Sequence, residues 1–251
     1  MQTDTLVNTS ARALDSPAPD RKVERLPFTV RLVSDTAALQ KAVHIRQAAY
    51  GRHIPELAKA LGEPETYDSE PGVMILLAES KLDGAPIGTM RIHTNASNRL
   101  GVEKSVILPA WLQGQRLSEA VRLGVSHGTV GHLAKAVLFK AYYQYCLANH
   151  VQWMITAARS PLDRQYEALL FKEVFPGQGY IPMLHIGNIP HRVMAFDVKS
   201  AEQRWREARH PMFDFMIRTH HPDLDIGLDT LNPRHGLPGT SATSDHVSVA
   251  A

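Results

Sequence analysis

Short apolar runs with strand-like alternation are separated along this chain by segments whose apolar residues recur with the period of a helix. The alternation predicts strands over residues 28–33, 73–78, 86–94, 117–125, 152–157, 180–185 and 192–198. The helical period predicts helices over residues 35–50, 54–61, 130–150, 161–174, 200–209 and 212–220. Leu82-Asp83-Gly84-Ala85 is a turn sequence, so we expect the second and third strands to form an antiparallel hairpin. Strands that alternate with helices in this way indicate an α/β fold.

The two ends of the chain lack this periodicity. Residues 1–26 are rich in Ser, Thr, Asp and Pro, and we expect a flexible N-terminal arm there. Residues 226–251 are also without a pattern and are expected to form a flexible C-terminal tail. No repeat or linker interrupts residues 27–225, which are predicted to fold as one domain.

Length and composition narrow the class of protein. The chain has 251 residues, of which 44% are hydrophobic and 21% are charged, as is typical of a globular protein. Its 27 basic and 25 acidic residues give a net charge of +2, which argues against nucleic acid as a partner. The polar N-terminal sequence predicts no signal peptide, and no apolar run approaches the roughly 20 residues that cross a bilayer. We therefore expect a cytoplasmic protein without a membrane span.

Several kinds of site are disfavoured by the residues present. The single cysteine, Cys146, cannot form an intramolecular disulfide or a cysteine-based zinc site. The 13 histidines show no metal-ligand spacing, so no metal site is predicted. There is no Gly-x-Ser-x-Gly sequence, and Cys146 lies within the apolar pattern of a predicted helix. Covalent catalysis by serine or cysteine is therefore not expected.

Charged residues inside predicted strands are the unusual feature of this sequence. Arg91 lies in Gly88-Thr89-Met90-Arg91-Ile92, and Glu119 and Arg122 lie in the strand over residues 117–125. Each charge alone is compatible with the solvent face of an antiparallel strand. Glu119 and Arg122 are three residues apart, however, so a regular strand directs them to opposite faces unless a bulge redirects one of them. If these groups are buried, each needs a charged partner.

Two further charged residues lie beside these elements. Arg46 is in the first predicted helix, and Asp68 ends the polar loop that leads into the strand over residues 73–78. The ordinary interpretations are a solvent-exposed arginine and a turn-forming aspartate.

Taken in chain order, these residues lie in segments that resemble a known signature. The segments are Ile45-Arg46-Gln47-Ala48-Ala49-Tyr50, Glu65-Thr66-Tyr67-Asp68, Gly88-Thr89-Met90-Arg91-Ile92 and Ser118-Glu119-Ala120-Val121-Arg122-Leu123-Gly124-Val125. They resemble the ordered motifs of the acyl-homoserine-lactone synthases and the N-acyl amino acid synthases, two branches of the GNAT acyltransferases. The resemblance covers residues 28–175. It implies an acyltransferase with a GNAT-like α/β fold, in which helices flank a central, mostly antiparallel sheet.

The departures from these families refine the expected activity. Coenzyme-A-using GNAT proteins resemble one another in an Arg/Gln-x-x-Gly-x-Gly/Ala loop, which residues 122–131 do not match. Homoserine-lactone synthases resemble one another in a tryptophan soon after the first helix, where this chain has Tyr50-Gly51-Arg52-His53-Ile54. We therefore expect an N-acyl amino acid synthase that takes its acyl group from the phosphopantetheine of acyl carrier protein (ACP), with no tightly bound cofactor. The alternatives are a homoserine-lactone synthase that uses S-adenosylmethionine, a non-catalytic carrier-protein-binding module and a coenzyme-A-dependent acetyltransferase.

The resemblance and the chemistry together suggest roles for the charged residues. The α-amine of the acceptor amino acid must lose a proton as it attacks the thioester, and Glu119 is the first candidate base, with Asp68 the second. Arg46 or Arg91 is expected to bind the acceptor carboxylate, because a guanidinium matches a carboxylate in a bidentate pair. Arg122 is expected instead to pair with Glu119 or Asp68 and to tie that carboxylate into a network.

Two further groups of residues are assigned to the acyl donor. A backbone N–H exposed by a bulge between Leu123 and Val125 is expected to stabilise the thioester oxygen as it gains charge. Carrier proteins are small and strongly acidic, so docking should use basic side chains. The candidates are Lys135, Lys140, Arg159 and Arg164, with a solvated helix face as the ordinary interpretation of the two lysines.

Overall fold

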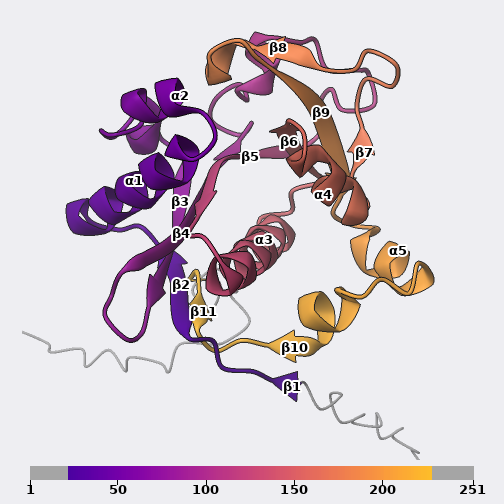
Figure 1. The fold of residues 1–251 in the computed structure, drawn as a ribbon. Coiled ribbons are helices and arrows are strands. Elements are labelled where there is room, and N and C mark those ends of the chain that lie inside the picture. Colours follow the sequence, from indigo (N-terminus) through magenta and orange to yellow (C-terminus); the bar gives the residue numbers. More distant parts are fainter. Residues whose placement is uncertain (1–21, 228–251) are drawn as a thin grey trace, which may run out of the picture.

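The computed structural model describes residues 22–227, so the expectations for residues 1–21 and 228–251 lie outside the described residues. A nine-stranded sheet runs in the order β11-β2-β3-β4-β5-β6-β9-β7, with β8 paired to β9 (Figure 1). Its neighbouring strands are antiparallel except for β11 with β2 and β5 with β6, which confirms the mostly antiparallel sheet. The strands are β2 (Phe28–Leu32), β3 (Met74–Ser80), β4 (Pro86–Thr94), β5 (Leu117–Val125), β6 (Trp153–Ala158), β7 (Lys172–Glu173), β8 (Ile181–Met183), β9 (Ile189–Asp197) and β11 (Leu224–Asp225).

Helices cover both faces of this sheet. In Figure 1, α1 and α2 lie on one face and α3 lies on the other. The α-helices are α1 (Thr36–Gly51), α2 (Pro55–Ala60), α3 (Thr129–Ala148), α4 (Leu162–Ala168) and α5 (Ala201–Glu207). Shorter helical turns are η1 (Thr66–Ser69), η2 (Val102–Lys104), η3 (Leu184–Ile186) and the π-helix η4 (Asp214–Arg218). No described helix is both long enough and apolar enough to cross a membrane.

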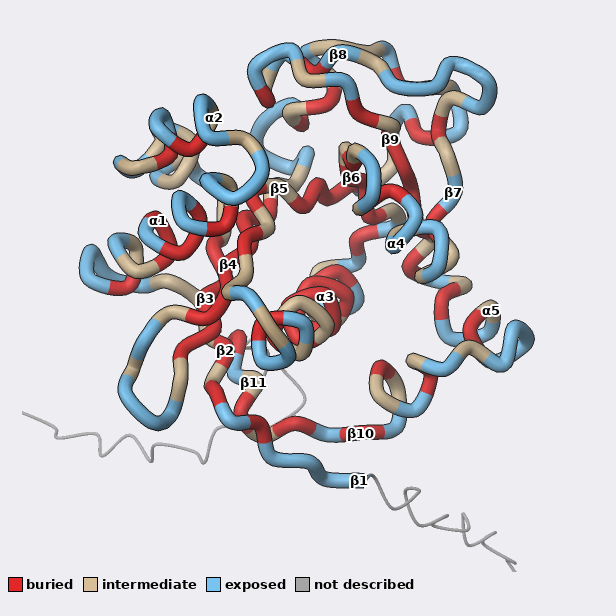
Figure 2. The backbone as a smooth tube through the Cα atoms, viewed as in Figure 1, coloured by how far each residue is buried: buried red, intermediate tan, exposed pale blue. Residues whose placement is uncertain are grey.

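Local sequence explains where the main helices begin and how they pack. The Asp35 carboxylate accepts a hydrogen bond of 2.7 Å from the Ala38 N–H, which confirms Asp35 as the N-cap of α1. The apolar stripe of α3 packs on Met90, Ile92 and Ala120 of the sheet. Figure 2 shows much of α3 buried, as expected for a helix at the centre of the main core.

The predicted helix over residues 161–174 is wrong in its second half, because α4 ends at Ala168. Leu170 adopts a left-handed φ of 70°, which a continuing helix does not allow. Phe171 then stacks on Phe196, with 4.9 Å between the ring centroids, and β7 pairs with β9. The apolar residues of this stretch therefore serve a short strand and an aromatic core.

The folded part of the chain extends slightly beyond residues 27–225. β1 (Lys22–Val23) pairs in parallel with β10 (Thr219–His220). Leu26 is buried, and its N–H donates a hydrogen bond of 2.8 Å to Asp223. Ile226 is also buried. Residues 22–26 and 226, assigned to the arm and the tail by the sequence, thus belong to the folded domain.

The bulge expected in the strand over residues 117–125 is present. The register between β4 and β5 shifts between Thr89 and Arg91, where β5 carries one extra residue. Arg122 lies in this bulge with a left-handed φ of 55°. The Arg122 side chain consequently reaches Glu65, the same carboxylate that Arg91 contacts from β4.

β5 also separates from its other neighbour. The parallel pairing of β5 with β6 covers only three residues of each strand, ending at Glu119 and Ile155. Beyond this point the two strands diverge, so the bulged half of β5 has no strand partner on that side in the part of the chain that the structure describes. A wedge therefore opens between β5 and β6 next to the bulge.

The close approach of α1 to β5 yields a test of the fold. A Cβ added at Gly124 would lie 3.1 Å from the Ala49 Cβ and 3.2 Å from the Arg46 Cα, so the helix backbone itself must shift. We expect Gly124→Ala to lower the free energy of unfolding by about 1–3 kcal/mol, measured by urea denaturation. Gly88→Ala is the matched control, because a Cβ there first meets only the ends of side chains on the opposite face. A loss at Gly124 no larger than at Gly88 would contradict this account.

Candidate functional site

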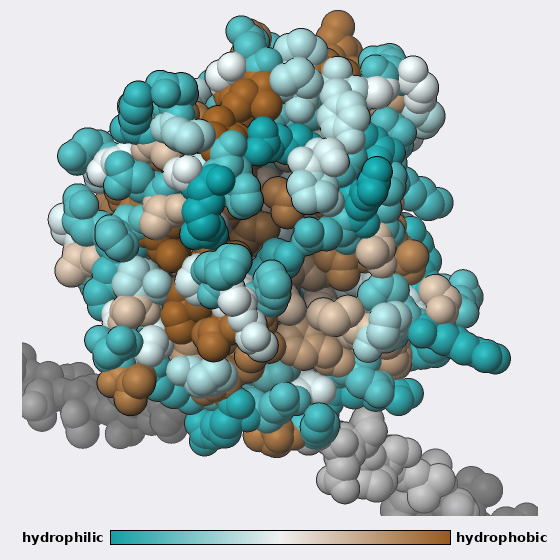
Figure 3. All heavy atoms as spheres, in the orientation of Figure 1, coloured by the Kyte–Doolittle hydropathy of each residue, from teal (hydrophilic) through white to brown (hydrophobic). Residues whose placement is uncertain are grey.

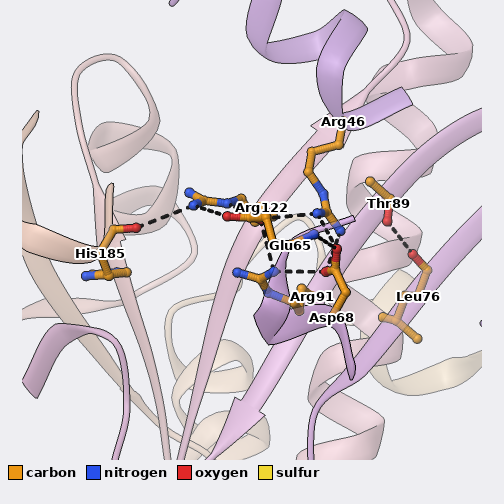
Figure 4. Close-up of polar contacts among 8 residues, drawn as sticks. All are labelled: Arg46, Glu65, Asp68, Leu76, Thr89, Arg91, Arg122 and His185. Carbon is orange, nitrogen blue, oxygen red and sulfur yellow. Dashed lines mark hydrogen bonds and ion pairs between the residues drawn. The ribbon is translucent and has the colours of Figure 1, made fainter. Parts of the chain in front are cut away.

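Three arginines and two carboxylates from four separate segments meet on the α1 face of the sheet (Figure 4). Arg46 binds Asp68 through both terminal nitrogens, at 2.9 Å each. Arg122 binds Glu65 through two nitrogens, at 2.8 and 2.7 Å. Arg91 joins the two pairs, with Nη1 3.0 Å from Glu65 and 2.8 Å from Asp68. These five residues form a single network, which we call the charge cluster.

The local structure around each member explains how the charge cluster forms. Glu65 is the N-cap of η1 and Asp68 its third residue, and the two form a capping box in which the Asp68 carboxylate accepts a hydrogen bond of 2.8 Å from the Glu65 N–H. This turn holds both carboxylates at one end of the loop before β3. Arg46 comes from α1, Arg91 from β4, and Arg122 from the bulge in β5. The cluster therefore ties one helix, one loop and two strands together.

The electrostatics of the charge cluster keep its carboxyls ionised. Burial raises the pKa of Glu65, but hydrogen bonds and positive charge from Arg122, followed by Arg91 and Arg46, more than offset this, so the net pKa is lowered. Burial also raises the pKa of Asp68, and Arg46 and Arg91 more than offset it in the same way. The Arg122 pKa is raised, because its bonds to Glu65 outweigh the effect of burial.

Glu119 lies on the same face of the sheet but outside the charge cluster. It is fully buried and stands opposite His93 in the register of β4 and β5. Its Oε2 accepts a hydrogen bond of 3.3 Å from the Val102 N–H, and its Oε1 lies 3.2 Å from Nε2 of His185. Burial and the charge of Arg91 lower the pKa of His93 to about 4, so His93 is neutral at pH 7.

A cavity of about 530 Å³ occupies the wedge between β5 and β6. Its lining includes Arg122, Leu123 and Val125 of the bulged strand, the end of α1, and the start of α3. Figure 3 shows this face of the molecule hollowed near its centre, with apolar side chains recessed behind polar ones. None of the described residues that line the cavity is Asp or Glu, whereas Arg52, Lys135 and Arg159 are among them. Its electrostatics therefore favour an anionic ligand with an apolar part.

The structure places the predicted docking residues in three different environments. Lys135 and Arg159 line the cavity, and Arg164 is exposed on α4. The prediction that Lys140 binds the carrier protein is wrong, because Lys140 is buried in the core and its ammonium donates to the carbonyls of Phe215 and Thr219. Lys140 thus attaches the C-terminal segment to α3 and is not accessible to a carrier protein. The helical period could not reveal this, because the carbonyls that Lys140 binds come from a distant segment.

The structure also revises the roles expected within the charge cluster. Arg46 is fully buried with both terminal nitrogens on Asp68, so it is not available to an acceptor carboxylate. Asp68 has a fully buried side chain, accepts bonds from two arginines and the Glu65 N–H, and has a lowered pKa. These features favour a positioning role for Asp68 over that of a base. Arg122 binds Glu65, and not the Glu119 or Asp68 expected from the sequence.

Two residues of the site received no role from the sequence. Glu65 stands in the segment that carries the resemblance, and its spacing from Asp68, acidic-x-x-acidic before a strand, is a capping-box signal. His185 has no comparable local signal, because it approaches Glu119 from a segment 66 residues later in the chain. Among residues 22–227 no group of three potential metal ligands is present.

Comparison with known proteins places the fold. The sequence matches no known family profile and no curated protein. FeeM, an N-acyl amino acid synthase from uncultured soil microbes, has a similar structure, with a TM-score of 0.57 and 19% identity over 75% of this chain and 97% of FeeM. BjaI, a CoA-dependent acyl-homoserine lactone synthase solved with SAM and isopentyl-CoA, gives a TM-score of 0.50 and 14% identity over 77% of this chain and 93% of BjaI. The chain has the GNAT-like acyltransferase fold that the resemblance implied.

The charge cluster predicts how stability responds to loss of one carboxylate. Glu65→Gln leaves three buried guanidiniums with one full carboxylate partner, so we expect the free energy of unfolding at pH 7 to fall by about 3–5 kcal/mol in urea denaturation. Glu56→Gln, which removes an exposed carboxylate paired with Lys59, should change it by less than about 0.5 kcal/mol.

The same variant tests the sign of the pH dependence. The pKa values of Glu65 and Asp68 are lower in the folded protein than the value of about 4 in an unfolded chain. Their contribution to stability is therefore present above pH 4 and is lost as pH falls below it. Glu65→Gln should be less sensitive to acid in this range than the wild type, and an equal sensitivity would contradict the assignment.

Proposed function

We propose that this protein is an N-acyltransferase that moves a fatty acyl group from acyl carrier protein to the α-amine of an amino acid. The observation that carries the proposal is the position of the β5–β6 cavity against the bulge at Arg122, with the buried Glu119 three residues away on the same strand. A thioester held in the wedge lies beside β5, and the third residue of this strand is Glu119. The similarity to FeeM supports an amino acid as acceptor.

The expected reaction needs a proton acceptor but no covalent intermediate. The amine nitrogen attacks the thioester carbon, the C–S bond breaks, and the amine loses a proton. Glu119 is the candidate acceptor, because it is buried and its Oε1 makes no hydrogen bond within the described part of the chain. The carboxylates of the charge cluster are unsuited, since arginines already bind both of them.

The bulged strand supplies the proposed stabilisation of the thioester oxygen. β5 has no strand partner on its β6 side beyond Glu119, so backbone groups of the stretch that contains Leu123 and Val125 border the cavity. An N–H aimed at the oxygen as it gains negative charge is worth about 3–4 kcal/mol of barrier reduction. The left-handed conformation of Arg122 sets the direction of these groups.

The basic lining of the cavity supports a phosphopantetheine donor. Within residues 22–227, the lining of the cavity includes Arg52, Lys135 and Arg159 and no carboxylate, and it reaches the N-terminus of α3 at Gly128. A phosphate group is stabilised by both features. Lys135, Arg159 and the exposed Arg164 lie on the two segments that border the wedge, where the acidic surface of a carrier protein would approach.

The second candidate function is acyl-homoserine-lactone synthesis from S-adenosylmethionine. The similarity of the fold to BjaI favours it, and the same cavity and carboxylate would serve amine acylation in that reaction. The two functions differ in acceptor and product. BjaI also uses a CoA thioester, so the carrier of the acyl group is tested separately.

Product analysis distinguishes these functions. The purified protein is incubated with long-chain acyl-ACP and either a mixture of amino acids or S-adenosylmethionine, and the products are identified by mass spectrometry. We expect N-acyl amino acids, with kcat reduced about 100-fold or more in Glu119→Gln. Glu202→Gln, an exposed carboxylate on α5, is the control and should retain wild-type kcat. A lactone product would establish the second candidate, and the absence of any acylated amine would contradict both.

Charge reversal at the cavity rim tests the donor. We expect Lys135→Glu with Arg159→Glu to raise KM for acyl-ACP about tenfold or more and to raise KM for the same acyl group on free phosphopantetheine markedly less, because both donors carry the phosphate and only the carrier protein adds an extended acidic surface. Lys199→Glu, at an exposed lysine away from the cavity, is the control. Equal effects on both donors would rule out carrier-protein docking at this rim, and faster turnover of acyl-CoA than of acyl-ACP would replace the donor assignment.

A further inference from the structure

Glu119 and His185 form a buried pair whose polar atoms are incompletely bonded. The Glu119 side chain is 0% exposed and that of His185 is 7% exposed. Glu119 Oε1 and both ring nitrogens of His185 make no hydrogen bond within the described residues, although Oε1 and Nε2 are 3.2 Å apart. Unsatisfied buried polar atoms are costly, and in enzymes without bound substrate they mark groups whose alignment completes during the reaction.

The position of the His185 ring is fixed by its surroundings. A Cβ added at Gly101 would lie 2.6 Å from the ring Cδ2, so only glycine allows this close packing. The residue after Gly101, Val102, donates its N–H to the other oxygen of Glu119. η2 and η3 thus hold the imidazole and the carboxylate against each other from two sides.

The segment that carries His185 also borders the cavity between β5 and β6, although the His185 ring itself does not line it. The His185 backbone carbonyl accepts a hydrogen bond of 3.4 Å from Arg122, which lines the cavity, and the neighbouring Ile186 lines the cavity as well. Glu119 itself does not line the cavity. Because the Glu119 side chain is 0% exposed and the His185 side chain is 7% exposed, the imidazole is the more accessible member of the pair for an amine bound at the thioester.

We propose that His185 takes the amine proton directly, in place of the Glu119 carboxylate named above, while Glu119 holds the ring and stabilises its positive charge. The inference rests on the proposed acyl transfer and assigns its proton path. As the amine nitrogen bonds to the thioester carbon, its proton moves to the ring nitrogen of His185 that faces away from Glu119. The C–S bond breaks, and the imidazolium returns that proton to the departing thiolate. The products are one amide and one thiol, with both residues restored.

Other charged and titratable groups surround the pair and shape its pH response. His93 and Arg91 face it from β4, Arg122 from the bulge in β5, and His191 from β9. The pKa of His93 is lowered to about 4, so His93 does not change charge near neutral pH. Burial lowers the pKa of His191, and its Nδ1 contacts the Ile189 carbonyl at 2.7 Å, so it is engaged elsewhere. Glu119 is the carboxylate that directly contacts the His185 ring.

The first experiment needs no substrate, so it tests the pair even if the proposed function fails. Nuclear magnetic resonance of the ring-labelled protein should show a slowly exchanging imidazole N–H proton from His185, whose chemical shift depends on the Glu119 carboxylate 3.2 Å away. We expect His185→Gln to abolish this signal and Glu119→Gln to shift it, while His221→Gln, which removes a buried imidazole beside Lys140, leaves it unchanged. Absence of the signal in the wild type, or an unchanged chemical shift in Glu119→Gln, overturns the proposed pair.

The second experiment follows turnover by thiol release. We expect His185→Gln to lower kcat about 100-fold with KM for donor and acceptor within threefold, and to remove the acidic limb of the pH profile of kcat. His185→Ala should regain part of its activity when imidazole is added, an effect that a purely structural histidine does not show. His221→Gln should keep the wild-type profile. A kcat within twofold of wild type in His185→Gln, or a pH profile of unchanged shape, overturns the relay.

Discussion

Burial of like charges is the constraint on which this site depends. Three guanidiniums packed within one network would repel one another and lose their hydration, so the fold requires Glu65 and Asp68 at one place between α1 and the sheet. The capping box of η1 supplies both carboxylates on a single turn. The loop before β3 is therefore an essential support of the sheet, even though it contributes little apolar surface to the core.

The same network holds the bulge that gives β5 its shape. A left-handed conformation at a non-glycine residue costs about 1–3 kcal/mol, and Arg122 adopts it inside a strand. Its two bonds to Glu65 offset this cost and fix the direction in which the backbone leaves the bulge. Because β5 has already separated from β6 at this level, the strained backbone borders the cavity directly. Electrostatics on one face of the strand thus determine the geometry offered to a ligand at its edge.

Features encoded locally could be predicted from the sequence, and features that depend on distant contacts could not. β4 and β5 have the predicted bounds, and the spacing of Glu119 and Arg122 correctly indicated a bulge. The end of α4 was missed because a stacked aromatic pair, not helical period, decides the conformation of Phe171. Lys140 was misassigned for a similar reason, since its carbonyl partners lie more than 70 residues away.

One strand separates two electrostatic environments. On the α1 face, β5 carries Arg122 and Glu119 among paired charges, whereas its edge borders a cavity whose described lining has basic residues and no carboxylate. In the proposed acyl transfer, a negatively charged donor is favoured in the cavity and disfavoured beside the Glu119 carboxylate. The bulge connects the two environments, because Arg122 lines the cavity and its guanidinium contacts Glu65 and the His185 carbonyl. The charge cluster that holds Arg122 therefore fixes where the cavity lies relative to the buried pair of Glu119 and His185.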